Sequence, residues 1–131
     1  DSGLYAPERS EQTYQRLASL AAQTLANGYP VIVDATHLKQ AQRQLMRDAI
    51  EDQGAPCLIL HCDAPQASIE QWLKERQQAG TDVSDAGIEV MRHQLQEMEP
   101  LDADEAALSI RVDTASDSAM SDLSEQLKKR L

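Results

Sequence analysis

The spacing of apolar residues predicts two amphipathic helices in the first half of the chain. Between Pro7 and Gly28, apolar side chains recur every three or four residues, which is the period of one helical face. A second stripe with the same period covers residues 39–53 and ends before Gly54. Proline is accepted in the first turn of a helix, and glycine is favoured just beyond its last turn. We therefore expect helices that end near Gly28 and Gly54.

Three short apolar runs predict strands, at residues 31–34, 57–62 and 108–112. The first run is apolar on both faces, which is typical of a parallel sheet covered by helices. Further helical patterns follow at residues 65–80, at residues 84–98 and at the C-terminal end. Helices and strands that alternate in this way predict an α/β domain with a parallel sheet. Three strands are few, since about five or six are usual, and this indicates that part of the sheet is missing.

Composition narrows the class of protein. The chain has 131 residues, which suits a single domain, and its formal net charge is −10. So acidic a chain is a poor partner for nucleic acid, because phosphate contacts need clustered Lys and Arg. No apolar run approaches the roughly 20 residues of a membrane span, and the polar stretch after Asp1 is unlike a signal peptide. We expect a cytoplasmic protein with no membrane partner.

The two cysteines are expected to be free and buried. Cys57 and Cys62 lie at the two ends of one predicted strand, and their odd separation directs them to opposite faces. Five residues of strand place them about 16 Å apart, which is too far for a disulfide.

Each predicted strand ends in an aspartate, namely Asp34, Asp63 or Asp113. Ligands of open α/β sheets bind at the carboxyl edge of the strands, where these side chains would lie. Aspartate is also favoured in turns and near helix starts, and we expect that role for Asp63 and Asp113. For Asp34 a functional role and a structural role both stay open at this point.

Asp34 is the strongest candidate for chemistry. Four residues ending in Asp and followed by Thr36 match the acidic strand that holds Mg²⁺, or a water bound to it, in phosphate-transferring proteins. We predict Asp34 as a catalytic residue that binds the metal through a water. Thr36 and His37 follow on the same loop, and Arg43 lies near the same sheet edge, so all three are predicted to bind substrate.

Arg76 is the candidate for charge neutralisation. It lies late in the third predicted helix, just before a flexible polar stretch at residues 77–84. An arginine on a mobile segment can close over a transferring phosphoryl group and stabilise its charge. Arg92 is expected only on a solvated helix face. His61 and Asp63 lack a third ligand for a metal site.

Several motifs together suggest a family. They are Gly3-Leu4-Tyr5-Ala6-Pro7-Glu8, Tyr14-Gln15-Arg16-Leu17, residues 28–36, Arg43, Arg76, residues 80–86, Gln94, Glu99-Pro100-Leu101-Asp102, Glu105 and Val112-Asp113-Thr114. In this order they resemble bacterial predicted kinases, which are P-loop ATPase-like proteins related to the polynucleotide kinase and zeta-toxin groups. Such kinases are often fused to an aminoglycoside-phosphotransferase-like domain. The match covers nearly the whole chain.

The resemblance implies a three-layer fold and ATP-dependent phosphoryl transfer with Mg²⁺. Asp34 and Thr36 would then face Mg²⁺ or substrate, and Arg76 would belong to a lid at about residues 70–98 and bind the ATP phosphates. None of the five glycines is followed by Lys, so the phosphate loop of the family is absent from this sequence. We therefore expect residues 1–131 to be the C-terminal part of one kinase-like domain, without its first strand, phosphate loop and first helix.

Such a fragment is expected to be inactive alone and to bind no ATP or Mg²⁺ tightly. A sheet without its centre exposes strand edges, so we also expect a homodimer through these edges or a rearranged sheet. The phosphoryl acceptor, a small molecule or a nucleotide, is not determined by the sequence. Two alternatives stay open: a non-catalytic α/β interaction module, and a receiver-type phosphoacceptor domain, whose acidic pair and Lys we do not find.

Overall fold

The computed structural model describes residues 7–78 and 85–131. This part of the chain contains six helices and one parallel two-stranded sheet. It divides into two compact units, the first made of residues 7–57 with 98–100, and the second of the other described residues. The predicted α/β class with a parallel sheet is confirmed, whereas the predicted single domain stays a prediction.

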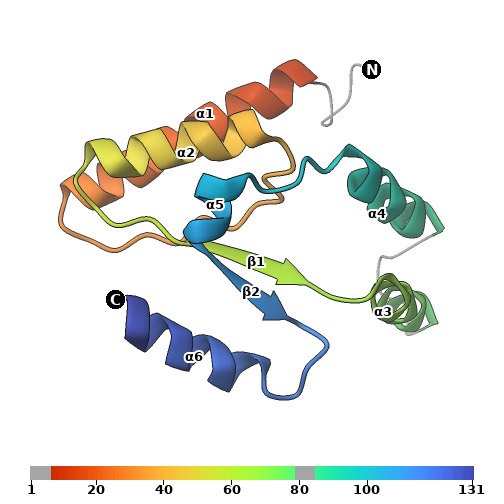
Figure 1. The fold of residues 1–131 in the computed structure, drawn as a ribbon. Helices are drawn as coiled ribbons and strands as arrows, with labels where there is room; N and C mark the ends of the chain where they lie inside the picture. Colours follow the sequence, from red (N-terminus) through yellow and green to blue (C-terminus); the bar gives the residue numbers. More distant parts are fainter. Residues whose placement is uncertain (1–6, 79–84) are drawn as a thin grey trace. The chain divides into compact units, whose positions relative to one another are not determined.

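Two helices form the first unit, as the apolar spacing predicts. Helix α1 (Pro7–Ala26) and helix α2 (Gln40–Asp52) lie side by side (Figure 1). Ala18, Ala21 and Met46 are buried at their contact, where the two small alanine side chains allow close approach of the helices. The core of this unit is therefore a helix pair.

Glycine ends both helices for a conformational reason. Gly28 has φ 85° and Gly54 has φ 71°, both in the left-handed region that side chains other than glycine rarely adopt. A Cβ atom added at either position would meet no heavy atom within 4 Å. Backbone conformation, and not crowding, therefore favours glycine at these positions.

The predicted strand at residues 31–34 is wrong, because no strand forms there in the described part of the chain. Val31 and Val33 pack against the α1–α2 core, while the side chain of Ile32 is 92% exposed. Covered and exposed side chains therefore alternate, as in an extended segment that packs one face against the two helices. A strand also needs a neighbouring strand for its ladder hydrogen bonds, and the described residues provide none for this segment.

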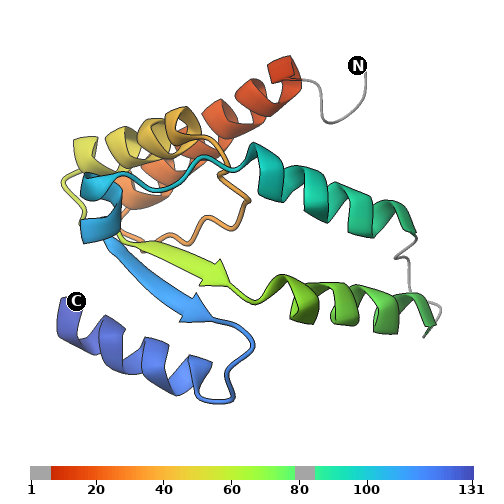
Figure 2. The same ribbon diagram turned by 45° about the vertical axis from the view of Figure 1, so that its right-hand side comes forward.

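The second unit contains the sheet. Strands β1 (Ile59–Asp63) and β2 (Ser109–Asp113) run parallel, with Asp63 opposite Asp113 at their carboxyl ends. Helix α6 (Ala119–Arg130) covers one face of β2, where Ile110 and Val112 are buried (Figure 2). Both strands begin and end within two residues of the predicted runs. The predicted homodimer through sheet edges stays a prediction.

A short helix before β2 was not predicted. Helix α5 (Ala103–Ala107) begins at Asp102, whose carboxylate accepts a 2.8 Å hydrogen bond from the Glu105 amide. The Glu105 carboxylate in turn accepts from the Asp102 amide at 3.1 Å, which completes a capping box. The Asp-x-x-Glu spacing is the sequence signal that would have revealed this helix.

Two further helices occupy the predicted lid region. Helix α3 (Gln66–Gln78) and helix α4 (Asp85–Glu97) are joined by Arg92, whose guanidinium donates to the Glu70 carboxylate at 2.9 and 3.1 Å. These hydrogen bonds hold the pKa of the Glu70 carboxyl below its usual range. Arg92 is therefore exposed, as predicted, but paired. Of the polar stretch at residues 77–84 that was predicted to be flexible, residues 77 and 78 belong to α3, and the others lie outside the described residues.

Both cysteines are free, as predicted, but they are not buried. Cys57, just before β1, is half-buried, and Cys62 is exposed on the same face of β1 as Leu60, which is 42% exposed. Burial raises the pKa of the Cys57 thiol, which therefore stays protonated and weakly nucleophilic. Within the described ranges, no helix has the length and apolar content to cross a membrane.

Candidate functional site

Tyr14, a buried residue of α1, anchors the loop at residues 34–38 through hydrogen bonds of its hydroxyl. The Tyr14 hydroxyl accepts a 3.0 Å hydrogen bond from the backbone N–H of His37. The same hydroxyl shares a 3.1 Å hydrogen bond with the Thr36 hydroxyl. One side chain thus fixes two consecutive residues of the loop.

His37 has a strained backbone and a buried ring edge. Its φ of 45° lies in the left-handed region, which is uncommon for residues other than glycine. The ring stands edge-on to the Tyr14 ring at 4.9 Å, and Nδ1 lies 3.4 Å from the carbonyl oxygen of Ala35. Nε2 is buried and has no hydrogen-bond partner among the described residues. Burial lowers the pKa of His37, and the nearby Arg43 charge lowers it further, against the Ala35 hydrogen bond.

Arg43 holds the other end of the loop. Its side chain is buried, and Nη1 donates to the carbonyl oxygens of His37 and Leu38 at 2.9 and 3.2 Å. Nη2 donates to the carbonyl oxygen of Pro100 at 3.2 Å, which ties residues 98–100 to the loop. The guanidinium therefore positions backbone. Its predicted role in binding substrate stays a prediction.

Glu99 reinforces the same junction between residues 98–100 and the loop. Its backbone N–H donates to the carbonyl oxygen of Leu38 at 2.8 Å, and its carboxylate accepts from the Gln40 amide at 2.7 Å. The second contact satisfies a backbone donor in the first turn of α2 and places a negative charge at the helix N-terminus, where it is stabilised. The loop is thus held by the side chains of Tyr14 and Arg43 and by the backbone N–H of Glu99.

Asp34 and Thr36 are the exposed side chains that this arrangement presents. Among the described residues, no hydrogen bond or ion pair involves the Asp34 carboxylate. The loop keeps its shape without that carboxylate, since Tyr14, Arg43 and Glu99 hold it. The carboxylate is consequently available to a ligand or a metal-bound water.

The other two strand-end aspartates have the predicted turn role. Asp63 accepts a 2.9 Å hydrogen bond from the Ala64 amide and pairs with Arg111 at 3.1 Å. Asp113 accepts a 3.0 Å hydrogen bond from the Ala115 amide. Both carboxylates thus stabilise the turns that follow their own strands.

Arg76 lies exposed in the last turn of α3, within the second unit. The structure brings Thr36, His37 and Arg43 together in the first unit, near Asp34 in the chain. The predicted role of Arg76 over a phosphoryl group stays a prediction.

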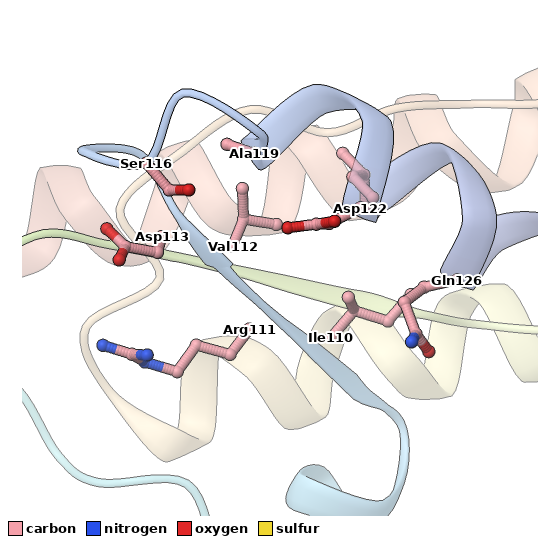
Figure 3. A pocket seen from close by; sticks show the side chains of 9 residues that line it. Ile110, Arg111, Val112, Asp113, Ser116, Ala119, Asp122 and Gln126 are labelled. Atoms are coloured by element: carbon pink, nitrogen blue, oxygen red, sulfur yellow. The ribbon is translucent and has the colours of Figure 1, made fainter.

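A hollow lies between β2 and α6 (Figure 3), with a volume of about 230 Å³. Ile110, Val112 and Asp122 are among its lining residues. It is smaller than the usual ligand pocket of about 300–1,000 Å³. None of the residues predicted to act in chemistry lines it, and its Asp113 carboxylate already stabilises a turn.

Comparison with known proteins gives one positive result. A family model described as "AAA domain" matches residues 1–101. The chain belongs to this AAA-domain family. The match supports a P-loop kinase-like family, as the motifs indicate. No curated protein and no solved structure matches the chain.

The AAA-domain assignment raises the question of whether these residues fit Mg²⁺ and ATP. Mg²⁺ keeps several waters and needs only one or two carboxylates, so the unpaired Asp34 carboxylate and the nearby Thr36 hydroxyl are suitable donors. Within the described chain, no group of three metal-binding side chains exists. The backbone cradle and Lys that hold a triphosphate have no counterpart in this sequence. The residues at 34–36 therefore fit a water-mediated metal contact, and a triphosphate cradle is not among residues 1–131.

Two residues that hold this loop, Tyr14 and Glu99, were named in motifs but not predicted as part of the site. The signal for Tyr14 is that a phenol buried on a helix face usually finds a hydrogen-bond partner. Glu99 carried no signal from spacing, because its partners lie 59 and 61 residues away in the chain.

Proposed function

We propose that the chain belongs to an ATP-dependent phosphotransferase that acts on a hydroxyl group of a small molecule or nucleotide. The family match supports phosphate chemistry in general. The observation that carries the proposal is the loop at residues 34–38, which is fixed by Tyr14 and Arg43 and leaves the Asp34 carboxylate unpaired. A loop held rigidly by its surroundings presents a functional group at low entropic cost.

Each predicted residue has a role in this proposal. Mg²⁺ would neutralise phosphate charge, and Asp34 would orient one of its waters. Thr36 would hydrogen-bond an oxygen of the substrate, and His37 would line the same site with its neutral ring. Arg43 would keep the loop in place. Arg76, exposed at the end of α3, would supply positive charge to the phosphoryl group.

The proposal is tested with the Asp34→Asn variant of the complete gene product, rather than of the 131-residue chain alone. We expect ATP turnover with a panel of acceptors (a nucleoside, a hexose and glycerol) to fall about a hundredfold or more, because the neutral amide no longer orients a metal-bound water. Asp63→Asn is the matched control, and it should leave turnover within about twofold. Equal turnover in the Asp34→Asn and unsubstituted proteins would overturn the proposal.

A second candidate is a non-catalytic interaction module that kept the fold. A module of this kind needs no Gly-Lys phosphate loop, and residues 1–131 contain no Gly-Lys pair. For the 131-residue chain alone, both candidates predict no binding of Mg-ATP at millimolar or lower concentration by calorimetry. They differ in the protein as its gene encodes it, where only the phosphotransferase consumes ATP.

A further inference from the structure

The Tyr14 hydroxyl lies at the centre of a short chain of hydrogen bonds. On one side it accepts the His37 backbone N–H at 3.0 Å, and on the other it meets Thr36 Oγ1 at 3.1 Å. Tyr14 itself is only 8% exposed, while Thr36 is exposed. The chain of hydrogen bonds therefore runs from a buried ring to a side chain at the surface.

Either hydroxyl could donate in the second hydrogen bond, and the first hydrogen bond favours Tyr14 as the donor. A backbone N–H can only donate, so it occupies an acceptor site of the Tyr14 oxygen. The phenolic proton is then best placed between Tyr14 and Thr36, since a phenol donates more readily than an aliphatic hydroxyl. Hydrogen bonds aligned in this way polarise one another and strengthen. When Tyr14 donates in this way, Thr36 accepts, and the Thr36 proton is left for another acceptor.

We propose that Tyr14 is a positioning residue, which fixes the Thr36 hydroxyl as a hydrogen-bond donor toward an oxygen atom of the substrate. The inference rests on the proposed function, because it assigns Thr36 to the same site. The Tyr14 hydroxyl also holds His37 in its left-handed conformation through the backbone N–H. Arg43 does not replace that contact, because its guanidinium donates to carbonyl oxygens of the loop and has no acceptor for the His37 N–H.

The first experiment measures hydrogen exchange of the His37 amide in the protein as its gene encodes it. Tyr14→Phe keeps the ring and removes the hydroxyl, so we expect this amide to exchange about tenfold faster. Amides of α2 should keep their rates. Tyr29→Phe is the matched control, because Tyr29 is 67% exposed. An unchanged His37 rate, or a uniform rise across α1 and α2, would overturn the inference.

The second experiment is a double-mutant cycle with Thr36→Val on KM and kcat for the acceptor that gives the fastest turnover in the panel. Loss of a hydrogen bond present in both ground and transition states raises KM and spares kcat. We expect either substitution to raise KM about tenfold. The double variant should be no worse than Thr36→Val, because Tyr14 acts through Thr36. Thr36→Ser should restore KM to within about threefold.

The outcomes separate this inference from the proposed function. Additive effects of Tyr14→Phe and Thr36→Val on KM would show that the two hydroxyls act independently, and would overturn the inference while Asp34→Asn still removes turnover. Absence of turnover in the unsubstituted protein with every acceptor would instead overturn the proposed function, and the substrate contact of Thr36 with it.

Discussion

The loop at residues 34–38 and the turns after β1 and β2 begin in the same way, with an aspartate after an apolar run. They are stabilised differently. Asp63 and Asp113 accept hydrogen bonds from backbone amides one and two residues further along the chain. Asp34 makes no such bond among the described residues, and the hydroxyl of Tyr14 and the guanidinium of Arg43 hold its loop instead.

The difference shows which aspartate is available for chemistry. A carboxylate that stabilises its own turn has its lone pairs engaged, and removing it costs stability. A carboxylate on a loop held by other residues costs little to remove and can bind a ligand. This contrast separates Asp34 from the other two aspartates, which sequence spacing alone could not do.

The largest expected effect on stability concerns Arg43. Arg43→Met should lower the free energy of unfolding by about 3 kcal/mol, because three part-buried carbonyl oxygens lose the donor that the buried Arg43 side chain supplies. Arg111→Met is the control from the second region. Its guanidinium is 64% exposed and pairs with Asp63, so its loss should cost less than about 1 kcal/mol. Urea unfolding followed by circular dichroism measures the loss in free energy of unfolding for both variants. Equal losses would contradict the difference between the buried Arg43 and the exposed Arg111.

A smaller effect is expected from the aspartates themselves. Asp63→Ala should cost about 1 kcal/mol, because the Ala64 amide and Arg111 lose their acceptor. Asp34→Ala should change stability by less than about 0.5 kcal/mol, since the carboxylate holds nothing in the loop. The same unfolding measurements test both. If Asp34→Ala were the more costly substitution, the assignment of Asp34 to ligand binding would lose its basis.

The smallest expected effect is the change of stability with pH that the ionisation of His37 causes. Burial lowers the pKa of this ring, and the Arg43 charge lowers it further, so NMR titration should give a midpoint below about 6.5. At pH values between the lowered His37 pKa of the folded protein and the ordinary histidine pKa of the unfolded chain, the unfolded chain binds more protons than the folded one. Stability should therefore rise with pH through this window and fall on acidification. A midpoint at or above 6.5 would contradict the buried position of the ring.

Most helices and both strands of the sheet were predictable from local patterns. The boundaries of α1 and α2 follow from apolar spacing and from glycines that take positive φ. The prediction of a strand at residues 31–34 was wrong. An apolar run indicates only that a segment is buried, whereas a strand also requires a neighbouring strand for its hydrogen bonds. Helix α5 was missed because it has only five residues and depends on the Asp102–Glu105 capping box.

Within the site, the sequence singled out Asp34, Thr36, His37 and Arg43, and it identified the family to which the motifs belong. It did not reveal how these residues are held. The contacts of Tyr14 with Thr36 and His37 span 22 and 23 residues, and the contact of Arg43 with Pro100 spans 57.

The sequence by itself determined the alternation of helices and strands, the acidic charge and the candidate residues, because these depend on side-chain chemistry and short-range periodicity. Only the tertiary structure decided that Asp63 and Asp113 are engaged in turns while the Asp34 carboxylate is left unpaired. The reason is physical: whether a carboxylate is engaged depends on which donors come near it in space. For the loop at residues 34–38, Arg43 and Glu99 donate to backbone carbonyl oxygens, and the Tyr14 hydroxyl accepts from the His37 amide, so these groups bind backbone rather than Asp34.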